Sequence, residues 1–145
     1  MTYLKGVIAS YACSRAFLCT MKDLTNWIIQ LIKQDELWRF YKCKEWIALK
    51  TAILQEAHYE CAECKKRGII TRHDADKNGK KKLISTVHHV QFVRKHPELA
   101  LSRTFMYKGK SYVNLIPVCK ACHNKLHPEK RAGNETEHYR NEERW

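Results

Sequence analysis

Two CxxC pairs, Cys61 with Cys64 and Cys119 with Cys122, constrain the fold of this 145-residue chain more than any other feature. Each pair offers two thiolates to one ion, and two pairs complete the tetrahedral all-cysteine site typical of structural zinc. The 54 residues between Cys64 and Cys119 leave room for a functional unit inside the site. The alternatives are two unrelated thiol pairs or a redox CxxC, but the βαβ pattern that usually carries a redox pair is not visible here.

Four histidines accompany the cysteines. The tandem pair His88 and His89 lies between the CxxC pairs, and His123 and His127 follow the second pair. Histidines four residues apart lie on the same face of a helix and can bind one ion together, while a third ligand comes from another segment of the chain. Strand alternation sends neighbouring side chains to opposite faces, so one histidine of the tandem pair can bind metal while the other approaches substrate. Asn124 stands where a zinc protease of the HExxH type needs its glutamate, which disfavours that activity.

The charge of the chain favours a polyanionic partner. Lysine and arginine total 27 against 15 acidic residues, a net charge of +12, and nucleic acid is the commonest polyanion. A merely solvated basic surface is the alternative. The seven cysteines are odd in number, and four of them form CxxC pairs, a spacing that suits metal better than disulfides. We therefore expect the protein to be located in a reducing cytoplasm, with Cys13, Cys19 and Cys43 as ordinary buried thiols. No apolar run approaches the ~20 residues that span a bilayer, so we expect no membrane association.

The hydrophobic pattern predicts an α+β chain. Apolar residues at helical spacing predict amphipathic helices around residues 24–32 and 44–58. Residues 65–82 carry turn and charge signals and are predicted to be an irregular, mobile, basic connection. Residues 83–90 (LISTVHHV) and 113–118 (VNLIPV) are predicted as strands, residues 107–110 as a loop tip and residues 120–128 as a helix.

A histidine-bound metal beside a second histidine, in a basic protein, suits phosphodiester hydrolysis. That reaction needs a deprotonated water, neutralisation of the phosphoryl charge and help for the leaving oxygen. A divalent ion supplies the last two, and a neutral histidine with an ordinary pKa near ~6.5 accepts the proton near neutral pH.

The chain resembles the HNH endonucleases, and most closely the small phage and prophage proteins with flanking CxxC knuckles. The resemblance rests on residues 87–90 (VHHV), 114–119 (NLIPVC) and 122–127 (CHNKLH), and it spans roughly residues 36–128, including the lead-in at 40–46 (FYKCKEW). It implies a small ββα-metal finger with a four-cysteine zinc knuckle site, preceded by amphipathic helices. The implied domains are an N-terminal extension (1–35), of which residues 1–20 are poorly specified, the nuclease domain (36–130) and a charged tail (131–145).

The resemblance also implies roles for individual residues. His89 would be the general base, Asn114 would brace the finger and help to orient the base, and His88, His123 and His127 would bind the catalytic ion. Many relatives read CHxxKT after the second knuckle, whereas Leu126 and His127 stand here, so the role of His127 is less secure than that of His123. The segment before Asn114 lacks the frequent Gly-Gly pair and has only Gly109.

The leading hypothesis is therefore a DNA endonuclease with one structural zinc and one catalytic Mg²⁺, Mn²⁺, Ni²⁺ or Zn²⁺. A zinc-stabilised nucleic-acid-binding module without catalysis is the main alternative, and thiol redox activity is a third. A phage packaging terminase as a partner is suggested by the resemblance alone. Five basic side chains are predicted to contact phosphates: Arg94, Lys108, Lys110, Lys120 and Lys125.

Overall fold

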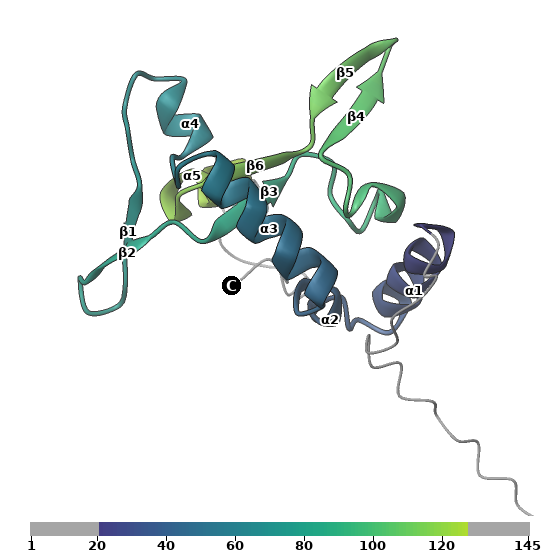
Figure 1. Ribbon diagram of the computed structural model, residues 1–145. Coiled ribbons are helices and arrows are strands. Elements are labelled where there is room, and N and C mark those ends of the chain that lie inside the picture. Colours follow the sequence, from purple (N-terminus) through teal and green to yellow (C-terminus); the bar gives the residue numbers. More distant parts are fainter. Residues whose placement is uncertain (1–20, 128–145) are drawn as a thin grey trace, which may run out of the picture.

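The computed structural model describes residues 21–127, in which short helices surround three two-stranded antiparallel sheets (Figure 1). The prediction of an α+β fold is confirmed. Residues 1–20 of the predicted extension (1–35) and the predicted tail at 131–145 lie outside the described residues. The helices are α1 (Met21–Lys33), α2 (Trp38–Tyr41), α3 (Lys44–Glu56), α4 (Ala62–Lys65) and α5 (Lys120–Leu126), with the 3₁₀ turn η1 (Pro97–Leu99). The strands are β1 (His73–Ala75), β2 (Lys81–Leu83), β3 (Thr86–His89), β4 (Thr104–Tyr107), β5 (Lys110–Val113) and β6 (Leu115–Val118).

The centre of the molecule is a ββα unit formed by β3, β6 and α5. β3 pairs with β6 from Thr86 opposite Val118 to His89 opposite Leu115. The two strands lie far apart in sequence, and α5 follows β6 after a single residue and contacts β3. This topology brings the histidines of β3 next to the helix that carries the other two histidines.

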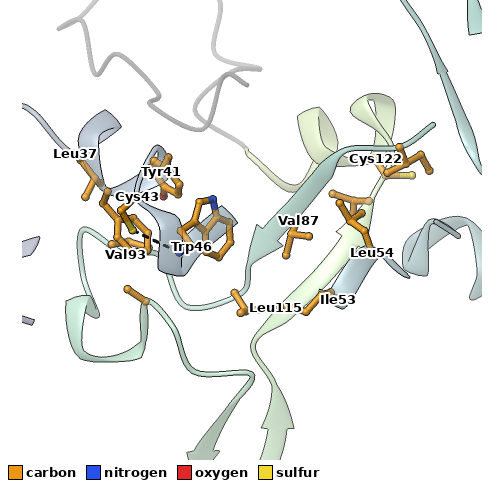
Figure 2. Packing of buried hydrophobic residues seen from close by; sticks show 14 of the residues in the cluster. Leu37, Tyr41, Cys43, Trp46, Ile53, Leu54, Val87, Val93, Leu115 and Cys122 are labelled. Atoms are coloured by element: carbon orange, nitrogen blue, oxygen red, sulfur yellow. Dashed lines mark hydrogen bonds between the residues drawn. The ribbon is translucent and has the colours of Figure 1, made fainter. Parts of the chain in front are cut away.

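Helix α3 packs across the β3–β6 pair and forms the main core. Its Ile53 and Leu54 are buried close to Val87 and Leu115 of the two strands (Figure 2). The helix begins where the Cys43 sulfur accepts a hydrogen bond from the Trp46 amide at 3.5 Å, which caps its first turn. α3 therefore fixes the orientation of the ββα unit.

An aromatic group lies at the other end of the same core. Phe40, Tyr41 and Trp46 are buried, and their ring centroids lie 5.1 to 5.8 Å apart in tilted or edge-on pairs. Such pairs contribute about 0.5–1.5 kcal/mol each beyond the area they bury. This group closes one face of β3.

Two hairpins project from the centre on opposite sides of Figure 1. β4 and β5 pair from Thr104 opposite Val113 to Tyr107 opposite Lys110, so the predicted loop tip is confirmed. β1 and β2 pair within residues 73–83, where the sequence had predicted an irregular connection, and that prediction is wrong. The predicted strand 83–90 belongs to two strands in the structure: β2 ends at Leu83, β3 begins at Thr86, and Ile84 is buried between them.

None of the helices in residues 21–127 is long and apolar enough to cross a bilayer.

Candidate metal centres

The first candidate centre is the four-cysteine cluster of Cys61, Cys64, Cys119 and Cys122. Cys61 and Cys64 lie at the start of α4, and Cys119 and Cys122 lie at the start of α5. All four are buried, and their sulfur atoms lie within 4.8 Å of one another. The short α4 turn and the first turn of α5 thus bring the two CxxC pairs together as the sequence predicted.

The distances between the sulfur atoms distinguish a metal site from a disulfide. The Cys64 sulfur lies 3.9 Å from that of Cys119 and 3.6 Å from that of Cys122. A disulfide needs about 2.05 Å. Four zinc–sulfur bonds of about 2.3 Å in a tetrahedron place the sulfurs about 3.8 Å apart. The cluster therefore fits a tetrahedral zinc ion and is free of disulfides.

Each of these thiols lies close enough to the others to affect their pKa values. A hydrogen bond with Thr71, followed by contacts with the other three thiols, lowers the pKa of Cys64 to about 7. Burial raises the pKa of Cys119 and of Cys122. Four adjacent thiols cannot all become thiolates without a cation between them, because each negative charge opposes the next. The cluster thus has the chemistry of a divalent-metal site.

Arg67 lies against the outside of this cluster, and the sequence analysis did not identify this residue. Its Nη2 donates to the sulfurs of Cys64 and Cys122, at 3.3 Å each. Hydrogen bonding to Cys64, together with the negative charge of Cys122, raises the guanidinium pKa. Four thiolates and one divalent ion together carry a net charge of −2, and a neighbouring cation offsets part of it. The only sequence signal was an arginine three residues after the first CxxC pair.

The second candidate centre is formed by His88, His123 and His127. His88 comes from β3, His123 from α5, and His127 directly follows that helix. All three are buried, and their ring nitrogens lie within 4.8 Å of one another. The structure thus brings His127 into the group, although its sequence context made it the least secure of the three.

The geometry of the three histidines fits one shared ion. The Nε2 atoms of His123 and His127 are 3.1 Å apart. Metal–nitrogen bonds of about 2.0–2.1 Å in a tetrahedron place two nitrogens about 3.3 Å apart. Three ligands leave a fourth position, and a cleft of about 740 Å³ lies beside His88, with Phe92, Ile116 and Lys66 also in its lining. A centre of this type retains room for substrate.

His89 lies on the opposite face of β3, as strand alternation predicted. Its ring stacks on Trp46 with centroids 4.7 Å apart, and it also contacts the Phe40 and Tyr41 rings. The side chain is 0 % exposed, whereas the role of general base that the resemblance implies requires contact with water. The reason is tertiary, because aromatic residues more than forty positions earlier in the chain close over it.

The hydrogen bond of His89 determines its chemistry. Nε2 lies 2.9 Å from the carbonyl oxygen of Ala100. A carbonyl oxygen only accepts, so Nε2 carries the hydrogen, and in the neutral ring Nδ1 then carries the lone pair. The fold therefore sets the tautomer of His89 by a backbone contact.

Asn114 connects the segment that carries Ala100 to the end of β3. It is fully buried. Its Nδ2 donates to the carbonyls of Leu99 and Ser102 at 3.0 and 2.9 Å, and its Oδ1 accepts from the Gln91 amide at 2.9 Å. Because the Leu99 and Ser102 carbonyls flank Ala100, Asn114 fixes the acceptor of His89 without touching that ring.

The basic residues predicted to contact phosphates lie on separate elements. Lys120 and Lys125 are exposed on α5, close to both clusters in sequence and space. Lys108 lies in the β4–β5 turn, in the left-handed region at φ 49°, and Lys110 is the first residue of β5. Arg94 donates to Asp35 at 2.9 Å. The described structure therefore does not gather these five into one patch.

Comparisons with known proteins give one similar structure. No family model matches the chain, and no curated protein matches it. Among solved structures, the chain is similar to the crystal structure of the HNH endonuclease of the deep-sea thermophilic bacteriophage GVE2 with manganese ion. The two are 24 % identical, the match covers 73 % of this chain and 92 % of that one, and the TM-score is 0.48.

Proposed function

We propose that the chain is a metal-dependent endonuclease of the HNH type that hydrolyses DNA phosphodiester bonds. The observation that carries the proposal is the convergence of His88, His123 and His127 on one point, with His89 held on the same strand in a defined tautomer. A zinc-stabilised binding module without catalysis would need the four cysteines and the positive charge. It would leave three buried, converging histidines without a role, and burying polar rings costs free energy.

The three histidines are proposed to hold a single divalent ion, for which Mg²⁺, Mn²⁺, Ni²⁺ and Zn²⁺ are the candidates. When bound, the ion would polarise the phosphoryl group and stabilise the leaving oxygen. Four cysteines with Arg67 are proposed to hold a separate structural zinc, which would clamp α4 to the start of α5. Because α5 carries both cysteines and histidines, that clamp would keep His123 and His127 at a fixed distance from β3.

His89 is proposed to be the general base: its Nδ1 is buried in the described structure and would accept the proton of the attacking water once the aromatic residues over the ring move aside. The Ala100 carbonyl keeps the hydrogen on Nε2, so the lone pair is on the other nitrogen before substrate arrives. Asn114 would act as a positioning residue, because it holds the backbone on both sides of Ala100. Stacking on Trp46 prevents ring rotation. Lys120 and Lys125 would contribute phosphate contacts from the exposed face of α5.

The proposal is tested by nicking of supercoiled plasmid DNA with each of the four ions in turn. A general base contributes about 10²–10⁴-fold, so His89→Ala should lower the nicking rate by at least ~100-fold. His96→Ala is the matched control, because His96 is an exposed histidine paired with Glu98 and should change little. Full activity of His89→Ala would contradict the assigned base. Persistent DNA binding without cleavage under any ion would favour the non-catalytic module.

A further inference from the structure

The β1–β2 hairpin is an ordered element, although its sequence reads as a solvated loop. The side chain of Asp76 organises the turn: its Oδ1 accepts from the amides of Asn78 and Lys80 at 2.8 and 2.9 Å. The Asp76 amide in turn donates to the Lys80 carbonyl at 2.9 Å. Gly79 supplies the left-handed residue at φ 76° that the reversal requires.

The base of the hairpin is attached to the helix that carries both candidate centres. Oδ1 of Asp74 accepts from the amide of Lys120, the first residue of α5, at 2.9 Å. The Ile84 amide donates to the Arg72 carbonyl at 3.0 Å, and the Cys61 amide donates to the Thr71 carbonyl at 2.9 Å. The Ile84 bond closes the base of the hairpin, and the other two bonds tie the hairpin to α5 and to the first CxxC pair, so its direction is fixed relative to the histidines.

The hairpin carries concentrated positive charge that no acidic side chain within residues 21–127 pairs with. Lys77, Lys80, Lys81 and Lys82 are all exposed. Within residues 21–127 none of the four forms a salt bridge, and the two nearby carboxylates, Asp74 and Asp76, accept backbone hydrogen bonds. Four like charges in six residues repel one another, and a polyanion removes that repulsion.

The hairpin also contributes little to the hydrophobic core. None of its strand residues is buried, and even Leu83 is 45 % exposed. Figure 1 shows it projecting away from the β3–β6 pair. An element that is fixed in direction, outside the core and rich in lysines without a salt bridge to the described residues is preorganised for a surface ligand, because binding costs little ordering entropy.

We propose that the hairpin at residues 73–83 is a clamp for the phosphate backbone of duplex DNA, positioned by Asp74 beside α5. The proposal rests on the proposed function, in that the clamped duplex is the substrate of the histidine centre. From Asp74 to the tip at Asn78 the chain extends roughly 10–15 Å. At about 3.4 Å per base pair the clamp would lengthen the DNA footprint by about three or four base pairs.

The test compares two triple variants with the same change in charge, each in the full-length His89→Ala background so that DNA stays intact. One variant carries Lys80→Gln, Lys81→Gln and Lys82→Gln in the hairpin. The control carries Lys22→Gln, Lys33→Gln and Lys44→Gln, which replace exposed lysines of α1 and α3. Thermal melting verifies that both remain folded. Fluorescence anisotropy with 30-base-pair and 8-base-pair duplexes is measured at several salt concentrations.

The hairpin variant should bind the long duplex at least tenfold more weakly than the control. Its plot of log affinity against log salt should be shallower by up to about 2.7, or ~0.9 for each lost phosphate contact. The two variants should bind the short duplex with equal affinity, because that duplex is too short to bring phosphates to the hairpin. Equal binding of the two variants to the long duplex would overturn the proposal, as would an unmodified protein that does not bind duplex DNA.

The result also separates the two proposals. A hairpin deficit in binding, together with an unmodified protein that nicks no plasmid, would retain the clamp and reject the nuclease. Normal nicking with equal binding of both variants would retain the nuclease and reject the clamp.

Discussion

The two candidate centres share one helix but differ in ligand count and in surroundings. α5 and the residue before it supply two cysteines to one centre, and α5 and the residue after it supply two histidines to the other. The cysteine centre has four ligands and an arginine against its sulfurs, which leaves no position for substrate. The histidine centre has three ligands and adjoins a cleft. Ligand count thus separates a site that holds a fold from a site that can perform chemistry.

The largest expected effect is loss of the cysteine centre. Structural zinc contributes apparent binding free energies of about 10–16 kcal/mol in small domains, comparable to the ~5–15 kcal/mol that stabilises a whole protein. Cys119→Ser should therefore abolish cooperative thermal unfolding and remove one zinc equivalent, as measured by circular dichroism and metal analysis. Cys43→Ser is the control, because Cys43 is buried outside the cluster and caps α3. A folded Cys119→Ser protein that retains its zinc would refute the structural assignment.

Loss of a histidine ligand should reduce activity while the fold persists. We expect His123→Ala to lower plasmid nicking by at least ~100-fold and to weaken binding of the second ion, because even outer-layer partners of metal ligands contribute 10–100-fold. The cysteine centre should retain its zinc, and unfolding should stay cooperative. Isothermal titration with Mn²⁺ measures the second ion. If His123→Ala lost the structural zinc instead, the two centres would not be separable.

Asn114 should affect stability and activity together. Asn114→Ala removes three hydrogen bonds to backbone groups around residues 91–102. A buried polar group left without a partner costs about 1–3 kcal/mol, so the free energy of unfolding should fall by roughly 3 kcal/mol. Urea unfolding measures this loss. Asn114→Asp keeps the oxygen that accepts the hydrogen bond from the Gln91 amide, so that bond should persist. An unchanged urea midpoint in Asn114→Ala would contradict the bracing role.

Arg67 should control retention of the structural ion without contributing to turnover. Arg67→Gln removes the hydrogen bonds to the Cys64 and Cys122 sulfurs. Zinc release to a colorimetric chelator should become about 10–100-fold faster, because outer-layer partners tune affinity by that amount. The nicking rate of zinc-loaded protein should stay the same. Lys66→Gln removes a neighbouring charge that pairs with Glu63 rather than with sulfur, and it should release zinc at the original rate.

The smallest effect concerns acid stability near the cysteine centre. Hydrogen bonds from Arg72 and then from Lys65 lower the pKa of Glu60 to about 2. Because the folded pKa lies below the unfolded value of about 4.3, the stabilisation is present above that value and disappears as the pH falls toward 2. Glu60→Gln should therefore lower the melting temperature slightly at pH 6, and the difference should shrink by pH 3. A difference independent of pH would show that packing, not charge, is responsible.

Local patterns were sufficient for much of the fold. Helices near 24–32 and 44–58 were predicted because apolar residues repeat at 3.6-residue spacing, and α1 and α3 confirm them. The metal clusters were also predictable, since cysteine and histidine spacing identifies groups that can converge. The β1–β2 hairpin was missed because it lacks apolar alternation, and its turn depends on backbone amides that donate hydrogen bonds to the Asp76 carboxylate rather than on burial.

The sequence by itself determined the candidate ligands, their order and the opposite directions of His88 and His89, because these follow from side-chain chemistry and from the period of a strand. Only the tertiary structure decided that His89 is buried against Trp46, that Ala100 sets its tautomer, and that Arg67 covers two sulfurs. Each of these contacts joins residues whose relation depends on how helices and strands pack. Packing is set by the whole core, so no local pattern in the chain encodes it.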